Sequence, residues 1–235
     1  MDFKKIWHSL LPFTFVVLML LITYWGNQWY FGATGIVGRD YSYILLWINQ
    51  QVPFQAWWIY PYVIAYPFWG LSFFYIGYRS KKAMYTIVSI VLFTFTIAGL
   101  TYFFLQSDVQ AWRETSGLFA RDPSTFSPAE ALTFWIYNHA GPRNANPSMH
   151  VLMSWLTIIG VRMDKKMPIV PKIVIWVLAI AITISTQTLK QHYIIDVITA
   201  IVLAEVFYFW LRKSPFVDKV EAFFTKLNKK VHLES

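Results

Sequence analysis

Two polar stretches interrupt an otherwise apolar chain, and the first runs from Ser185 to Asp196. It places Lys190, His192 and Asp196 between two apolar runs. His192 and Asp196 are four residues apart, so on a helix they would share one face. A carboxylate at the start of an apolar helix costs free energy unless it has a partner, and His192 is the nearest candidate. The pair indicates an imidazole of fixed tautomer that can attack or accept a proton. The alternative is a lysine reaching the membrane surface beside a structural His–Asp pair.

The second stretch is Pro147-Ser148-Met149-His150, at the head of another apolar run. Pro147 followed by Ser148 favours the start of a helix, whose first amides offer free N–H groups to anions. The plainer alternative is a helix cap followed by an interfacial histidine. Taken together, the two stretches suggest a phosphate-handling site. One histidine would attack phosphorus, and the other would protonate the leaving oxygen.

Several other kinds of site are excluded or disfavoured. The chain has no cysteine, which rules out disulfides, thiolate zinc sites and cysteine nucleophiles. It has no HExxH motif and no carboxylate cluster near His192, so neither a metal nor a cofactor is expected. A Ser–His–Asp triad using Ser148 would lack a glycine-rich nucleophile turn. The net charge of +8 comes from basic residues between apolar runs, which favours the lipid bilayer as partner over nucleic acid.

The composition, 57% apolar and 14% charged, is typical of a membrane protein. We expect an all-α, polytopic domain over residues 1–211, followed by a basic amphipathic tail over residues 212–235. The segment 41–50 is expected to form a helix along the membrane surface. Six spans, each near the roughly 20 residues that a bilayer requires, are predicted: Ile6–Gly26, Ala56–Gly77, Ala83–Leu105, Ser148–Val161, Pro171–Leu189 and Tyr193–Leu211.

The distribution of positive charge predicts the orientation. Most of the 20 basic residues, beginning with Lys4 and Lys5, fall on one side of these spans. By the positive-inside rule both termini are cytoplasmic, and the loops 27–55 and 106–147 and the turn at Lys190 face outward. We therefore expect a multi-pass protein of the cell membrane with an extracytoplasmic site. The outward side holds only five basic residues: Arg39, Arg113, Arg121, Arg143 and Lys190.

The patterns Pro147-Ser148-x-His150 and Ser185-x6-His192-x3-Asp196 resemble two motifs of the type-2 phosphatidic acid phosphatase superfamily. Those motifs, the second and third of that family, are Pro-Ser-Gly-His and Ser-Arg-x5-His-x3-Asp. The order of spans and motifs is also similar, and the resemblance covers roughly residues 102–200.

The resemblance implies a role for each matching residue. His192 would be the nucleophile that becomes phosphorylated, and Asp196 would orient it. His150 would protonate the leaving group, and Ser148 would hold a phosphate oxygen. The phosphohistidine would then be hydrolysed by water or passed to an acceptor alcohol.

The chain also departs from the family pattern. Thr186 stands in place of the third-motif arginine, and Met149 in place of the second-motif glycine. The first motif, Lys-x6-Arg-Pro, is poorly kept; Arg113 is the preferred match and Arg121 the alternative. Additional phosphate ligands are expected near the motifs: Lys190, Arg143 and Asn144.

The function expected is a metal-independent lipid phosphatase that hydrolyses a phosphate ester at the outer face. The pattern Ser-Thr-x3-Lys-Gln-His-Tyr-x2-Asp looks most like the inositol-phosphorylceramide-synthase-like branch, which implies a lipid head-group phosphotransferase as the alternative. A non-enzymatic transporter or scaffold on the same fold is a third interpretation. The lipid substrate and the oligomeric state stay open at the level of sequence.

Overall fold

The computed structural model of the chain describes residues 6–233, so Lys4 and Lys5, which contribute to the predicted orientation, lie outside the described residues. The described part is built of helices, joined by loops that carry two isolated β-bridges, Arg39 with Ser107 and Asp108 with Arg143. The prediction of an all-α protein is therefore confirmed.

Four helical segments are long and apolar enough to cross a membrane. They are the continuous helix Trp7–Thr34, α5 (Lys81–Phe104), α9 (Ile169–Thr188) and α10 (Ile194–Leu211). Two further helices, α4 (Ile59–Arg79) and α8 (Met149–Met163), match the other predicted spans. α4 is long enough, but tyrosine, tryptophan and proline lower its hydropathy. α8 has only 15 residues.

The first helix extends past the predicted end at Gly26. It comprises α1 (Leu10–Leu20), a π-helical turn (Leu21–Trp25) and α2 (Gly26–Thr34), and it ends where Gly35 adopts a φ of +68°. Asn27, one of the polar residues that suggested a loop, finds hydrogen-bond acceptors in its own helix and in α5. Asn27 Nδ2 donates to the Thr23 and Gly99 carbonyls at 2.7 and 3.2 Å. Polar side chains with partners in the bundle do not end a helix.

The loops carry three short helices, α3 (Leu46–Asn49), α6 (Gln110–Glu114) and α7 (Pro128–Ala140). The predicted surface helix over residues 41–50 is thus wrong apart from one turn. Leu45 has a φ of +56°, and the Asn49 amide turns back to donate to the Ile44 carbonyl at 3.1 Å. Both features interrupt helical geometry before residue 46.

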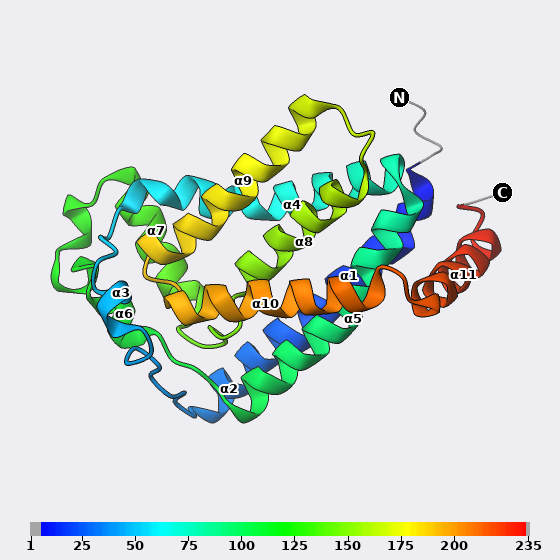
Figure 1. The fold of residues 1–235 in the computed structure, drawn as a ribbon. Coiled ribbons are helices and arrows are strands. Elements are labelled where there is room, and N and C mark those ends of the chain that lie inside the picture. Colours follow the sequence, from blue (N-terminus) through cyan, green and yellow to red (C-terminus); the bar gives the residue numbers. More distant parts are fainter. Residues whose placement is uncertain (1–5, 234–235) are drawn as a thin grey trace.

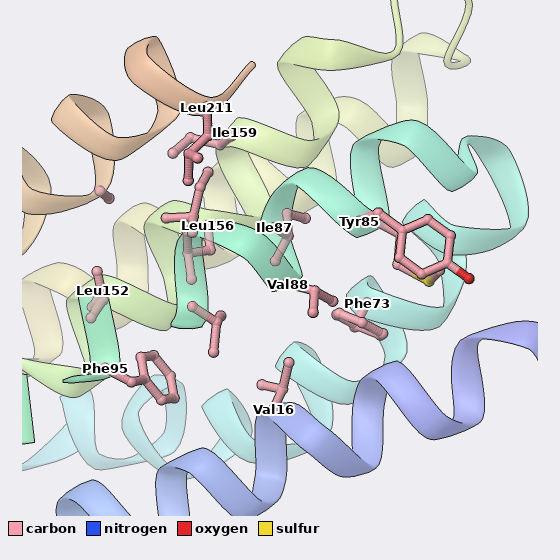
Figure 2. Close-up of a cluster of buried hydrophobic side chains, with 14 of the residues drawn as sticks. Val16, Phe73, Tyr85, Ile87, Val88, Phe95, Leu152, Leu156, Ile159 and Leu211 are labelled. Atoms are coloured by element: carbon pink, nitrogen blue, oxygen red, sulfur yellow. The ribbon is translucent and has the colours of Figure 1, made fainter. Parts of the chain in front are cut away.

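The main core lies where α5 meets α1, α4, α8 and α10. Figure 2 shows Val16, Phe73, Phe95 and Leu156 from four of these helices pointing into one cluster. The tail forms α11 (Pro215–Lys230), whose Val217 and Phe224 are buried in this same cluster. Part of the amphipathic face of the tail therefore packs on the bundle.

The two ends of the bundle differ in their contents. Figure 1 shows α3, α6 and α7 gathered at one end, which we call the loop end, and α11 at the other. At the end away from the loops, Arg79 Nε pairs with Asp164 Oδ2 at 2.9 Å. The Asn228 amide of α11 donates to the His8 carbonyl at 2.9 Å. The residues predicted to do chemistry all belong to the loop end.

Candidate active site

His192 lies in the turn between α9 and α10. α9 ends at Thr188, α10 begins at Ile194, and the His192 backbone amide donates back to the Thr186 carbonyl at 3.2 Å. The expectation that His192 and Asp196 share one helical face is therefore wrong, because His192 precedes the helix. The turn, rather than helical periodicity, brings the two side chains together.

The His192 imidazole is oriented through Nδ1. This atom lies 2.9 Å from the Ala145 carbonyl oxygen and 3.5 Å from Asp196 Oδ2. A carbonyl oxygen can only accept a hydrogen bond, so Nδ1 carries the proton and Nε2 of the neutral ring carries the free lone pair. The backbone carbonyl is the shorter contact, and Asp196 is the second partner of the ring.

Asp196 joins the two polar stretches. Its Oδ2 accepts from the Tyr193 backbone amide at 2.8 Å, which caps α10. Its backbone carbonyl accepts from the Ser148 amide at 3.1 Å. Asp196 Oδ1 is buried and has no hydrogen-bond partner among the described residues. The carboxylate therefore holds the start of α10 while one of its oxygens stays unused.

Ser148 caps α8, as its position after Pro147 suggested. Its Oγ accepts from the Val151 amide at 3.4 Å, and the residue is fully buried. The loop before it is held by Ser107, whose Oγ accepts from the Ala145 and Asn146 amides at 2.8 and 3.1 Å. The predicted phosphate-binding hydroxyl thus lies at a helix N-terminus beside the Asp196 backbone.

His150 lies in the first turn of α8 and is 7% exposed. Its Nε2 is buried with no hydrogen-bond partner among the described residues. The segment that leads to His150 is joined to the His192 turn at two points, by the Ala145 carbonyl at His192 Nδ1 and by the Ser148 amide at the Asp196 carbonyl. The structure therefore brings together the two histidines that the sequence separates by 42 positions (192 − 150).

Arg113, on α6, presents a buried guanidinium to the same region. It donates to the Tyr137 carbonyl (3.2 Å), the Gly141 carbonyl (2.6 Å) and Gln191 Oε1 (2.5 Å), and it is 2% exposed. No carboxylate pairs with it among the described residues, and its Nε has no partner. Burial lowers the pKa of Arg113, because desolvation disfavours the cation. A buried cation without a counter-charge attracts anions.

Lys190 provides a second buried cation. Its ammonium lies 3.7 Å from the centroid of the Trp112 ring and donates to the Val52 carbonyl, and the residue is 4% exposed. Burial lowers the pKa of Lys190 to about 8. The Trp112 indole N–H donates to the His192 carbonyl at 3.3 Å. Lys190 is therefore fixed beside the turn that carries His192.

The other two predicted phosphate ligands have structural partners. Arg143 Nε donates to the Ile36 carbonyl at 3.2 Å. The Asn144 side chain accepts from Gln106 Nε2 at 2.7 Å and donates to the Tyr24 carbonyl at 2.8 Å. Their phosphate contacts stay predictions, and the geometry favours a role in holding the loop.

The two candidates for the first motif occupy different places. Arg121 forms an ion pair with Glu130 on the surface, and its guanidinium lies over the Phe126 ring. Arg113 is hydrogen-bonded to Gln191, the residue before His192. Only Arg113 of the pair is joined to the turn that carries His192.

Sequence reasoning missed several residues around the histidines. Trp112 reaches the His192 carbonyl from a distant segment, and Gln191 binds Arg113 in the same way; no local pattern reveals either contact. The aromatic residues Tyr62, Tyr66 and Trp69 of α4 surround His150, and their spacing of four and three residues is the signal that could have identified them. Among the described residues no group of three or more His, Cys, Asp or Glu side chains could hold a metal ion.

Comparisons with protein-family models, with curated proteins and with solved structures find no match for this chain. The chemistry of the site therefore rests on its own geometry. An imidazole with a free lone pair, a second imidazole and two cations without a carboxylate partner in the described part of the chain are groups that can receive a phosphoryl group.

Proposed function

We propose that the protein is a membrane enzyme that cleaves a phosphate ester of a lipid through a phosphohistidine at His192. One observation carries this proposal: His192 Nδ1 is held by the Ala145 carbonyl and Asp196, which leaves Nε2 as the nucleophilic nitrogen. Buried Arg113 and Lys190 would stabilise the charge on the phosphoryl oxygens. The resemblance to the type-2 phosphatidic acid phosphatase superfamily supports the same roles.

The steps follow from these positions. Nε2 of His192 attacks phosphorus, and the bond from phosphorus to the alcohol oxygen breaks. His150, when protonated, donates a proton to that oxygen, so the alcohol leaves neutral. Ser148, at the start of α8, supplies a hydroxyl and helix amides for a phosphoryl oxygen. Water then attacks the phosphohistidine and gives a proton to His150, which releases phosphate and regenerates both histidines.

Transfer to an acceptor alcohol is the second candidate, and the enclosure of the site favours it. His192 is 5% exposed and His150 is 7% exposed. A site from which water is largely excluded protects a reactive intermediate from hydrolysis. The phosphoryl group, or the phosphoryl head group of a diester, would then pass to a second lipid alcohol.

We further propose that all six helices cross the bilayer and that the loop end faces outward. The basic residues at the opposite end support this orientation, because positive charge gathers on the cytoplasmic side. Arg79, Lys165 and Lys213 belong to that end. The substrate phosphate would then lie at the outer surface of the membrane.

The proposal is tested by trapping the intermediate. Purified protein is mixed with phosphatidic acid labelled with ³²P in its phosphate and quenched in alkali, in which phosphohistidine persists. We expect acid-labile label on the wild-type protein and none on His192→Ala. Loss of the nucleophile should lower turnover by more than about a thousandfold. Adding an acceptor alcohol separates the two candidates, since hydrolysis releases phosphate and transfer forms a new ester.

The matched control is His139→Ala. His139 is exposed on α7, where its ring stacks on Trp135 away from the site, so this variant should label like the wild type. Wild-type turnover in His192→Ala would end the mechanism proposed here.

A further inference from the structure

One face of α4 forms an aromatic box around the imidazole of His150. Tyr62, Tyr66 and Trp69 recur at positions i, i+4 and i+7, so they lie on the same side of the helix. The Tyr62 ring is stacked on the imidazole, with centroids 4.1 Å apart and planes 20° apart. Trp69 and Tyr66 meet it edge to face, at 5.2 and 5.8 Å. The occupant of this box is therefore a side chain of the protein itself.

The box is itself held in place. The Trp69 indole N–H donates to Ser154 Oγ of α8 at 3.0 Å, one turn below His150. Tyr62 is buried in a cluster with Ile59 and with Leu189 of the turn that carries His192. The Trp69 and Tyr62 rings of the box therefore have fixed positions relative to both histidines.

His150 relies on these rings because its ring is not oriented in the way that His192 is. His192 Nδ1 has a backbone carbonyl as acceptor, whereas His150 Nε2 has no partner among the described residues. Aromatic faces carry negative charge density and attract a cation placed over them. His192, when protonated, opposes a positive charge on His150.

We propose that Tyr62 and Trp69 are positioning residues for His150. They fix the orientation of the imidazole and favour the protonated form that donates to the leaving alcohol. This inference rests on the proposed function, in which His150 acts as the acid. It adds the source of orientation for an imidazole whose Nε2 has no hydrogen-bond partner among the described residues.

The test compares two substrates that differ in their need for an acid. An alkyl phosphate has a poor leaving group that must be protonated, whereas p-nitrophenolate leaves without help. Tyr62→Leu and Trp69→Leu remove a ring and keep an apolar side chain. We expect each to lower kcat for the alkyl ester about tenfold, the size expected for a buried cation–π contact, and for p-nitrophenyl phosphate less than about twofold. KM should stay within about twofold of the wild-type value for both esters.

Tyr62→Phe keeps the ring, so it should restore the wild-type ratio of the two rates. Equal losses on both substrates in Tyr62→Leu, or no recovery in Tyr62→Phe, would mean that the rings only pack, and the inference would be wrong. His150→Ala separates this from the proposed function. A selective loss on the alkyl ester in His150→Ala keeps the acid role even if the box is rejected. No selective loss in His150→Ala rejects the acid role and the box together.

Discussion

At the scale of single residues, His192 depends on a backbone carbonyl as much as on a carboxylate. The Ala145 oxygen lies 2.9 Å from Nδ1, while Asp196 Oδ2 lies at 3.5 Å and also accepts from the Tyr193 amide. A carbonyl cannot change its protonation state, so the tautomer of His192 is fixed at any pH at which the neutral ring exists. In the proposed mechanism, Asp196 would balance the positive charge that His192 gains on phosphorylation.

Lys190 predicts a pH dependence of substrate binding. Burial lowers the pKa of its ammonium to about 8 from an ordinary value of 10.5. The charge is present below that pH and is lost as the pH rises through it. If Lys190 binds the phosphate, KM should rise about tenfold from pH 7 to pH 9, where the substrate phosphate is already ionised. Lys190→Arg should keep KM flat over this range, because arginine stays charged.

Lys190→Met is the matched control for the KM profile. It should show a high KM that does not vary between pH 7 and pH 9, and a wild-type pH profile in this variant would assign the titration to another group.

By linkage, the same depressed pKa of Lys190 means that the unfolded chain binds more protons between pH 8 and pH 10.5. The free energy of unfolding from this residue therefore rises with pH in that window.

At the scale of elements, the loop after α2 is fastened to the turn that carries His192. Asp40 Oδ1 accepts from the Tyr193 hydroxyl at 2.9 Å, and Asn49 Oδ1 accepts from the Ile194 backbone amide at 3.0 Å. The Gln55 amide donates to the Thr188 carbonyl at 3.1 Å. The first amides of a helix lack partners within it, so Asn49 supplies what α10 needs.

Asn49→Ala should therefore weaken both the fold and the site. Asn49 is 1% exposed, and its loss leaves the partly buried Ile194 amide without this acceptor. We expect the free energy of unfolding to fall by about 1–3 kcal/mol, and kcat to fall with it because the His192 turn loosens. Thermal unfolding in detergent and steady-state turnover measure the two effects. Asn49→Asp keeps an acceptor and should lose less stability and less activity. Gln50→Ala, at the exposed neighbouring position, should also lose less of both. If Asn49→Ala keeps the wild-type stability and kcat, the hydrogen bond to Ile194 is not needed.

The elements differ in how far the sequence could predict them. Three predicted spans begin and end within two residues of the helices α5, α9 and α10: Ala83–Leu105, Pro171–Leu189 and Tyr193–Leu211. Long apolar runs have few alternatives to a helix in a bilayer. The predicted end of the first helix at Gly26 is too early, because the contact of Asn27 with α5 forms only in the folded protein.

The sequence likewise indicates some parts of the candidate site and not others. The sequence singles out His192, Asp196, Ser148 and His150 as candidates because polar residues at the ends of apolar helices are conspicuous. The Ala145 carbonyl and the aromatic box were not found. A backbone acceptor has no signature in sequence, and aromatic residues near the end of a span are ordinarily attributed to the membrane interface.

At the scale of the whole molecule, α8 decides the topology. Its 15 residues span about 22 Å, less than the roughly 30 Å of the hydrocarbon core. Because the chain contains no cysteine, single cysteines can be labelled without background. Ser124→Cys should react with an impermeant maleimide in intact cells, and Lys165→Cys and Lys230→Cys only after permeabilisation. Labelling of residues 124 and 165 from the same side would mean that α8 does not cross the membrane.

The two buried cations beside His192 have a consequence for the molecule as a whole. Arg113 and Lys190 are 2% and 4% exposed and have no carboxylate partner among the described residues. Desolvating them without a counter-ion costs free energy each time the chain folds. An anion that fills the site offsets that cost, and by mass action it raises the stability of the folded state, by about 2.7 kcal/mol at a hundredfold excess over its Kd. The phosphate of the proposed substrate would then stabilise the fold for as long as it is bound.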